Sequence, residues 1–431
     1  MKRAFFSLYG GFIARYLVSF VSLPFLAHIL GPTGLGALAI ATSVAAAISI
    51  FVEYGFDISA LREVSSANPG DRGQILINVT AAKLALFGLA GLIFDVLRLS
   101  VPAVSRFPAD LGLVVLLGGA RGFNLGWYFL GTGRATLSAL IDGFAQLMWF
   151  VPVIFLVHSA SEVNLILTCQ LAAEIVLVVL THATALMKMN FSEISVDRCL
   201  VIEQVKSGGS MFVFKVAGAA YFAIIALILA AVAGPAQVGY LNAAERFAGV
   251  IVNAFHPAAQ ALMPYVYGRV AKGGPDAMFG VARYILVGLL GVSIVFTVGA
   301  CVGAKLLIAA FVGSQFTPSI QVLQILSLTF PFIAINNVLG VYVMLPLRLD
   351  GSFVAAVLAA QWLGLGLTYL VAPGFGAAGV AFIRVGTEAT MSIIFSLMLY
   401  KKGHLKKLLF QSQYGWIKRF LTHFNHHARR N

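Results

Sequence analysis

Apolar segments of membrane-spanning length recur along the whole chain and are separated by short polar loops. A spanning helix needs about 20 mostly apolar residues. By that measure the sequence predicts twelve spans, near residues 10–30, 37–58, 77–97, 110–131, 137–158, 163–187, 210–233, 239–262, 279–302, 320–345, 352–372 and 376–400. Hydrophobic residues make up 60% of the chain and charged residues only 10%, against about 25% charged in soluble domains. The pattern predicts an all-α, polytopic membrane protein.

Two glycine-proline loops indicate an internal duplication. Gly31-Pro32-Thr33-Gly34-Leu35-Gly36 joins the first two spans, and Gly234-Pro235-Ala236-Gln237-Val238-Gly239 joins two more, at an offset of 203 residues. Gly126, Tyr128 and Arg134 recur as Gly340, Tyr342 and Arg348, at an offset of 214. Each half then holds six spans, so the two lobes are expected to share one orientation and to be related by a pseudo-two-fold axis along the membrane normal. Repeats of this kind are typical of transporters.

The loop pattern predicts four regions. These are an N-terminal six-helix lobe over 1–188, a cytoplasmic linker over 189–209, a C-terminal six-helix lobe over 210–400 and a basic cytoplasmic tail over 401–431. The tail mixes lysines with leucines and aromatic residues. That composition suits a helix on the anionic inner leaflet, but a solvated, disordered end is an equal alternative.

The net charge of +13 reflects topology more than partner choice. Counting loops from a cytoplasmic N-terminus, most Lys and Arg fall on one side, and Arg98, Arg106 and Lys305 fall on the other. By the positive-inside rule both termini are then cytoplasmic. Nucleic-acid binding is not expected.

The first span of each half carries one cation at membrane depth. Arg15 shares a helical face with Ser19, and Lys215 lies about one turn from the position that aligns with Arg15. An ionisable residue at such a depth costs about 2.5–3.5 kcal/mol on insertion scales, so it faces a partner or a hydrated cavity. We therefore expect Arg15 and Lys215 to face the protein interior.

The eighth span carries the strongest polar stripe. Its members recur at intervals of four, three, four and three: Asn242, Arg246, Gly249, Asn253 and His256. The second span carries Thr42, Ser49, Glu53 and Asp57 at similar spacing. Because such faces cannot contact acyl chains, spans one, two, seven and eight are predicted to line a central hydrated cavity.

Other charged residues have simpler interpretations. Lys83 and Asp57 lie close enough to span ends to snorkel. Arg121, Asp142 and Glu174 have no ion partner three or four residues away, so they pair across helices or contact water. The carboxylates that are candidates for coupling transport to an ion are Glu53, Asp142, Glu174 and Glu245.

A cavity lined by Arg15, Lys215 and Arg246 suits an anionic substrate, because arginine in particular matches the geometry of phosphate oxygens. Four asparagines, Asn242, Asn253, Asn336 and Asn337, offer hydrogen bonds to sugar hydroxyls, although asparagine more often joins helices to one another. No nucleotide, zinc-protease or serine-hydrolase motif is present, and Cys169, Cys199 and Cys301 are scattered. We expect no enzyme activity, no cofactor and no bound metal.

Several segments resemble the polysaccharide/O-antigen flippase branch of the multidrug/oligosaccharidyl-lipid/polysaccharide exporter superfamily. They are the Leu30–Gly36 loop, Glu53-Tyr54-Gly55-Phe56-Asp57, Trp127-Tyr128-Phe129-Leu130-Gly131, the stretch from Phe311 to Ser327 and the stretch from Gly376 to Glu388. The likeness covers nearly the whole chain. It departs from a common family pattern at Leu130 and Thr132, where a glutamine and an acidic residue often stand.

The resemblance implies a two-lobed helical transporter of the bacterial inner membrane. It would move an undecaprenyl-diphosphate-linked oligosaccharide from the inner to the outer leaflet by alternating access. H⁺ or Na⁺ is a candidate coupling ion, and a polysaccharide polymerase or co-polymerase is a candidate partner. The diphosphate would be held by Arg15, Lys215 and Arg246, and the cavity lined by Ser19, Ser49, Asn242, Asn253 and His256.

Two alternatives remain open. A cation-coupled drug or metabolite antiporter would favour an anionic cavity. A membrane glycosyltransferase or ligase acting on the same lipid carrier would need a sizeable site outside the membrane, which the short outer loops do not offer.

Overall fold

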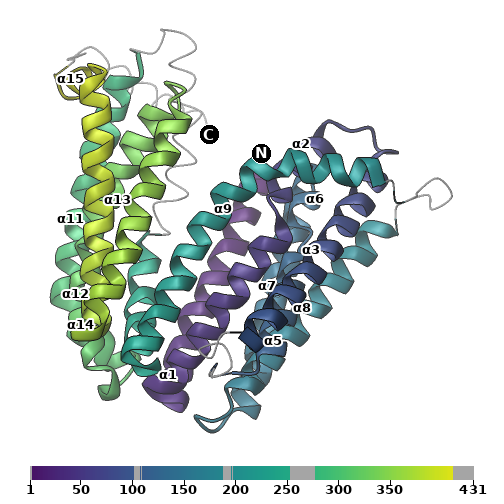
Figure 1. The fold of residues 1–431 in the computed structure, drawn as a ribbon, viewed down its shortest axis with the longest axis horizontal. Helices are drawn as coiled ribbons and strands as arrows, with labels where there is room; N and C mark the ends of the chain where they lie inside the picture. Colours follow the sequence, from purple (N-terminus) through teal and green to yellow (C-terminus); the bar gives the residue numbers. More distant parts are fainter. Residues whose placement is uncertain are drawn as a thin grey trace. The chain divides into compact units, whose positions relative to one another are not determined.

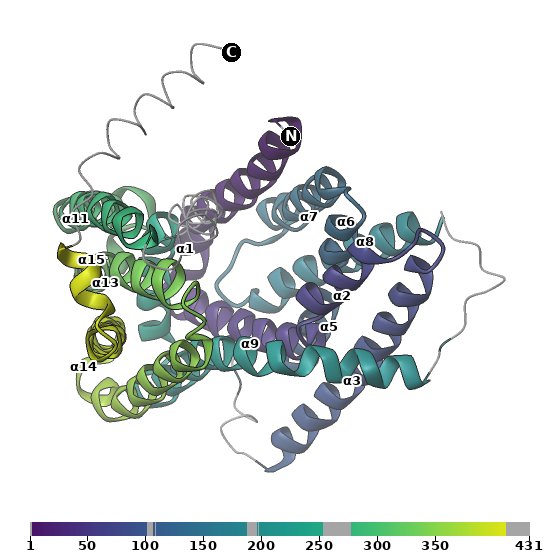
Figure 2. The same ribbon diagram turned by 90° about the horizontal axis from the view of Figure 1, so that it is seen from above.

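The protein is described by a computed structural model that covers residues 2–100, 107, 109–187, 196, 198–252 and 277–410. The side chains of some helical residues, 2–17, 19 and 20 among them, lie outside that description. The described chain is helical throughout (Figures 1 and 2). Seven of its described helices are long and apolar enough to cross a membrane, and two shorter apolar helices accompany them. A polytopic membrane fold is confirmed, whereas twelve spans, two-fold symmetry and the cytoplasmic side of both termini stay predictions.

The chain divides into two compact units. The first holds Met1–Phe247, Gly303–Leu323 and Leu365–Ala381, and the second holds Ala248–Val302, Gln324–Gly364 and Phe382–Asn431. In chain order the elements are α1 (Lys2–Glu53), α2 (Phe56–Ser66), α3 (Arg72–Ser100), α5 (Leu111–Gly122), α6 (Gly126–Gly131), α7 (Ala135–Leu156), α8 (Val163–Leu186), α9 (Arg198–Ala233), α11 (Ala277–Phe311), η2 (Ser314–Phe316), α12 (Pro318–Ser327), α13 (Thr329–Asn336), the π-helical η3 (Asn337–Met344), α14 (Asp350–Lys401) and α15 (His404–Phe410).

The longest helices each contain two of the predicted spans. α1 is kinked at Gly31 (φ 62°) and α14 at Gly376 (φ 53°), so each is a pair of helices joined without a loop. α9 begins at Arg198, well before the predicted start of the seventh span at residue 210. No proline interrupts the sequence from Arg198 to Ala233, so the helix can run through it without a break. The second part of the expected linker is therefore helical.

The first unit is built around α1. The helices α5, α7 and α9 pack against it, and Figure 2 shows α9 running beside α1 toward α3. Small residues on α5 permit this contact, because a Cβ at Gly118 would lie 2.7 Å from the Ala45 carbonyl oxygen and one at Gly122 2.6 Å from Val52 Cβ. The α1–α5 pair forms the centre of this unit.

The two glycine-proline loops meet each other in the first unit. A Cβ at Gly36 would lie 1.8 Å from the Pro235 carbonyl oxygen, and a Cβ at Gly239 would lie 2.0 Å from the Pro32 carbonyl oxygen. Aligned residues of the two halves thus exchange equivalent contacts, and neither position has room for a side chain. We call these four residues the hairpin contact.

Candidate functional site

The helical stripe predicted for the second span is broken before its last member. α1 ends at Glu53, Tyr54 (φ 50°) and Gly55 (φ 79°) adopt left-handed conformations, and α2 begins at Phe56 with Asp57 in its first turn. A left-handed backbone is unfavourable for tyrosine. Its ring stacks on Phe212 of α9 at a centroid distance of 4.2 Å, which holds the turn in place. The prediction of one continuous helical face through Asp57 is therefore wrong.

This turn brings two carboxylates to one ammonium. Lys215 Nζ of α9 lies 3.0 Å from Glu53 Oε2 and 2.5 Å from Asp57 Oδ2. Asp57 also sits at the N-terminus of α2, where the helix dipole favours a negative charge. The three side chains are 24–30% exposed. The ion pair is thus within reach of water or of a ligand.

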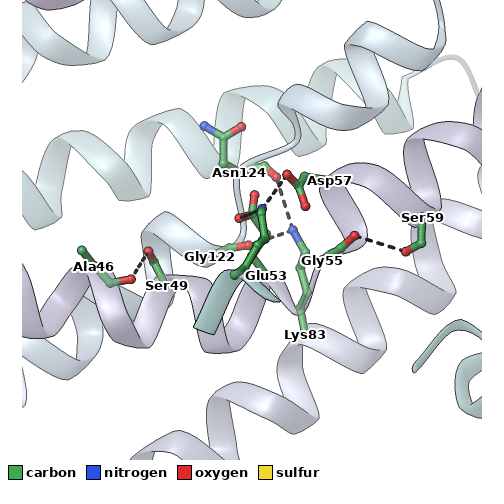
Figure 3. Close-up of polar contacts among 10 residues, drawn as sticks. Ala46, Ser49, Glu53, Gly55, Asp57, Ser59, Lys83, Gly122 and Asn124 are labelled. Atoms are coloured by element: carbon green, nitrogen blue, oxygen red, sulfur yellow. Dashed lines mark hydrogen bonds and ion pairs between the residues drawn. The ribbon is translucent and has the colours of Figure 1, made fainter. Parts of the chain in front are cut away.

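A second lysine lies beside the pair and is fully enclosed. Lys83 of α3 is 1% exposed, and its Nζ donates to the carbonyl oxygens of Gly122 at 2.8 Å and Asn124 at 3.3 Å (Figure 3). α5 ends at Gly122, where the Asn124 side chain accepts from Gly126 N and starts a local turn that competes with the helix. The carbonyls freed at a helix end attract a cation. The prediction that Lys83 snorkels to a span end is wrong, because this broken helix offers a buried partner. We call Glu53, Asp57, Lys83 and Lys215 the ion cluster.

The three charged residues without local ion partners make contacts across helices, as predicted. Arg121 Nε of α5 lies 3.4 Å from Glu174 Oε1 of α8, and Arg121 Nη2 donates to Gln170 Oε1 at 3.0 Å. Asp142 of α7 accepts from Asn124 Nδ2 at 3.3 Å. These contacts join α5, α7 and α8 around the break that Lys83 occupies.

The other predicted site residues are only partly described. Ser49 donates to the Ala46 carbonyl of its own helix at 2.8 Å (Figure 3), which leaves its oxygen free to accept. Asn242, Glu245 and Arg246 lie on the helix over 235–252 and are half-buried. The side chains of Arg15 and Ser19, and the whole of Asn253 and His256, lie outside the described residues. The binding and coupling roles assigned to all of these residues stay predictions.

A separate polar cluster lies in the second unit. Asn336 Nδ2 at the end of α13 donates to Glu388 Oε2 of α14 at 2.7 Å, and Ser392 Oγ donates to Asn336 Oδ1 at 2.7 Å. Asn337 donates to Ile333 O of the preceding turn. The interpretation of Asn336 as a residue that joins helices is confirmed.

A polar cavity that the sequence does not predict opens between α2, α3 and α9. Its volume is about 750 Å³. Most of its lining side chains are polar: Ser59, Arg62, Glu63, Ser66, Asp71, Gln74, Asn78 and Gln204. Ser59 connects it to the ion cluster, because its Oγ donates to Gly55 O at 3.3 Å, in the turn between Glu53 and Asp57 (Figure 3). No spacing in the sequence indicates this cavity, since its walls come from three separate elements.

Comparisons with known proteins identify a family and a fold. A family model described as "Polysaccharide biosynthesis protein" matches residues 1–267. The putative O-antigen transporter of Escherichia coli (strain K12) is 24% identical over 395 residues, which cover 90% of this chain and 92% of that protein. Among solved structures, the lipid II flippase MurJ in an inward closed conformation matches with a TM-score of 0.71 at 13% identity, over 95% of this chain and 90% of that one. An inward-facing multidrug resistance MATE family transporter of the MOP superfamily matches with a TM-score of 0.66 at 13% identity, over 94% and 96%. At these identities the two structures support the fold alone.

Proposed function

Because the chain belongs to the polysaccharide biosynthesis protein family, we propose that it is a flippase for an undecaprenyl-diphosphate-linked oligosaccharide repeat unit. It is a multi-pass protein of the bacterial inner membrane, and its relatives are transporters by name. The proposed product of its activity is the same lipid-linked glycan in the outer leaflet, ready for export as exopolysaccharide, capsule or O-antigen. No covalent chemistry is needed.

The single observation that carries the proposal beyond family membership is the partly exposed side chain of Lys215, which lies in the segment predicted as the seventh span. A lysine inside a membrane-spanning segment costs free energy. Lysines are found in such segments mainly where they line a substrate or ion pathway. We assign the diphosphate to Arg15, Lys215 and Arg246, and the sugar-facing lining to Ser19, Ser49, Asn242, Asn253 and His256. Alternating access between two repeats would then carry the bound head group across while the lipid stays in the bilayer.

Glycan export in cells tests this proposal. In a strain lacking its own exporter, the wild-type gene restores surface polysaccharide, and Arg15→Ala loses export at a normal protein level. Lys305→Ala, an exposed lysine of α11, is the matched control and retains export. Full complementation by the triple variant Arg15→Ala, Lys215→Ala, Arg246→Ala would contradict the assignment.

The same strain separates the alternatives. A drug antiporter would protect a pump-deficient host against cationic drugs, and a glycosyltransferase would transfer sugar in purified form. Neither result is expected, because the chain belongs to the polysaccharide biosynthesis protein family and the proposed reaction forms no glycosidic bond.

A further inference from the structure

We propose that Lys215 is shared between substrate and carboxylates: a diphosphate withdraws Lys215 from Glu53 and Asp57, and the released carboxylates take up a proton. This inference rests on the proposed function and deepens it, because it makes the substrate's own charge the trigger for ion coupling. The proton would come from water. It would bind a carboxylate oxygen, and no bond to the substrate would form or break.

The geometry favours an exchangeable contact. Lys215 Nζ contacts one oxygen of each carboxylate, at 3.0 Å for Glu53 and 2.5 Å for Asp57. Its side chain is 24% exposed, whereas that of Lys83 is enclosed and held by two carbonyl oxygens. A diphosphate that joined Glu53 and Asp57 at this ammonium would place several negative charges around one positive charge, which favours withdrawal of the lysine from the carboxylates. Of the two lysines, Lys215 is therefore the one that a ligand can reach.

Withdrawal of Lys215 would leave the ion cluster with excess negative charge, which favours the uptake of a proton. In the structure two carboxylates face two ammonium groups, Lys215 in direct contact and Lys83 nearby. Removing Lys215 leaves two negative charges with one cation in a poorly solvated place, which is unfavourable for the second charge. The Oδ1 atom of Asp57 is buried and has no hydrogen-bond partner in the described structure, so it is the oxygen that gains most from a proton.

Other carboxylates around the ion cluster already have partners, among them Glu63 of the cavity wall, whose Oε2 accepts from Gln204 Nε2 at 2.6 Å. Lys83 of α3 is the remaining cation, Asp142 of α7 already accepts from Asn124, and Glu174 of α8 is neutralised by Arg121 of α5. The polar cavity of about 750 Å³ brings water close, because its wall residue Ser59 bonds the turn between the two carboxylates. In the proposed exchange the proton arrives from this cavity, on the side of α2 and α3.

Calorimetry with farnesyl diphosphate tests the exchange on the full-length protein in detergent. Titrations in buffers of different ionisation enthalpy count the protons taken up. Wild type is expected to take up close to one proton more than the double variant Glu53→Gln, Asp57→Asn, and that variant should bind at least about tenfold more tightly because Lys215 is already free. Lys215→Met should weaken binding by about tenfold or more, whereas Lys305→Met should bind as wild type does.

The possible results distinguish a failure of the proposed exchange from a failure of the proposed flippase function. If wild type binds farnesyl diphosphate but not farnesol, and the double variant takes up as many protons with unchanged affinity, the exchange is wrong and the proposed flippase survives. Unchanged affinity in Lys215→Met would contradict both the exchange and the assignment of Lys215 to the diphosphate, but it would leave the proposed flippase activity standing. If wild type binds neither ligand, the proposed function itself fails. The double variant keeps the test informative even if Lys215→Met folds poorly, because amides replace the carboxylates with little change of shape.

Discussion

The hairpin contact and the ion cluster are two places in the first unit where the aligned halves of the sequence meet, and they meet in opposite ways. At the hairpin contact both halves supply the same residues, since Gly36 faces Pro235 and Gly239 faces Pro32. At the ion cluster one side supplies Glu53 and Asp57, and the other supplies Lys215. Where two backbones cross closely, the steric limit is the same for both segments, so aligned positions of the hairpin contact hold the same residue types. An ion pair requires its partners to differ. Under the predicted duplication, aligned positions keep the same residues where the chain turns and differ where the side chains are charged.

The strongest destabilisation is expected where the backbone leaves no room. Gly36→Ala places a Cβ 1.8 Å from the Pro235 carbonyl oxygen, so one of the two segments must move. We expect a loss of about 3 kcal/mol in the free energy of unfolding, read as a lower thermal midpoint in detergent. Gly239→Ala should lose a similar amount, because its contact is reciprocal.

The control for this pair is Gly88→Ala on α3, where nothing lies within 4 Å of the added Cβ. It should be neutral or slightly stabilising, as alanine is the better helix former. Equal thermal midpoints for wild type, Gly36→Ala and Gly239→Ala would show that the hairpin contact imposes no steric limit on these two positions.

A more moderate loss is expected at the buried lysine of the ion cluster. Lys83→Met removes the donor to the Gly122 and Asn124 carbonyl oxygens and leaves them unpaired inside the protein. The expected cost is about 1–3 kcal/mol, measured again by the thermal midpoint. Lys305→Met is the matched control on an exposed position. A variant as stable as wild type would show that the broken α5–α6 junction does not depend on the ammonium.

The weakest of these effects concerns the turn that packs beside the first glycine-proline loop, where Gly34 approaches the Ala160 carbonyl. Glu162 Oε2 accepts from the backbone N–H groups of His158 and Ser159, at 2.7 and 3.1 Å, and these bonds hold the pKa of the Glu162 carboxyl below its usual range. A lowered pKa means that the bonds stabilise the fold above the unfolded value of about 4.3, and that this contribution disappears as the pH falls through the folded value.

Glu162→Gln should therefore lower the thermal midpoint slightly at neutral pH, and the difference from wild type should vanish in acid. Midpoints measured across the acidic range provide the check. A difference that grows as the pH falls would mean that the carboxylate is not stabilised by the turn.

Many residues of the site can be predicted from the sequence, but the pairing of their charges cannot. The polar stripes single out Glu53, Lys215 and Arg246, and the missing local partners of Arg121 and Glu174 predict their contact across helices. Sequence reasoning misplaces Lys83, because a break at Phe123–Leu125 cannot be recognised from an apolar run. It also misses the cavity beside Ser59, because three elements build that cavity.

Apolar run length, periodicity and local turn chemistry are properties of the sequence. They suffice to predict a membrane environment, an all-helical fold and the residues that are too polar for lipid, and the repeated loops predict a duplication. Which charges meet depends on the folded chain. Glu53 and Asp57 converge on one ammonium only because Tyr54 and Gly55 turn left-handed between them, held by the stack on Phe212. Lys215 reaches them from far along the chain, and Gly208 of the same helix α9 lets it approach, since a Cβ there would lie 2.9 Å from the Tyr54 carbonyl oxygen. Contacts of this kind depend on packing between distant segments, and no local pattern encodes that.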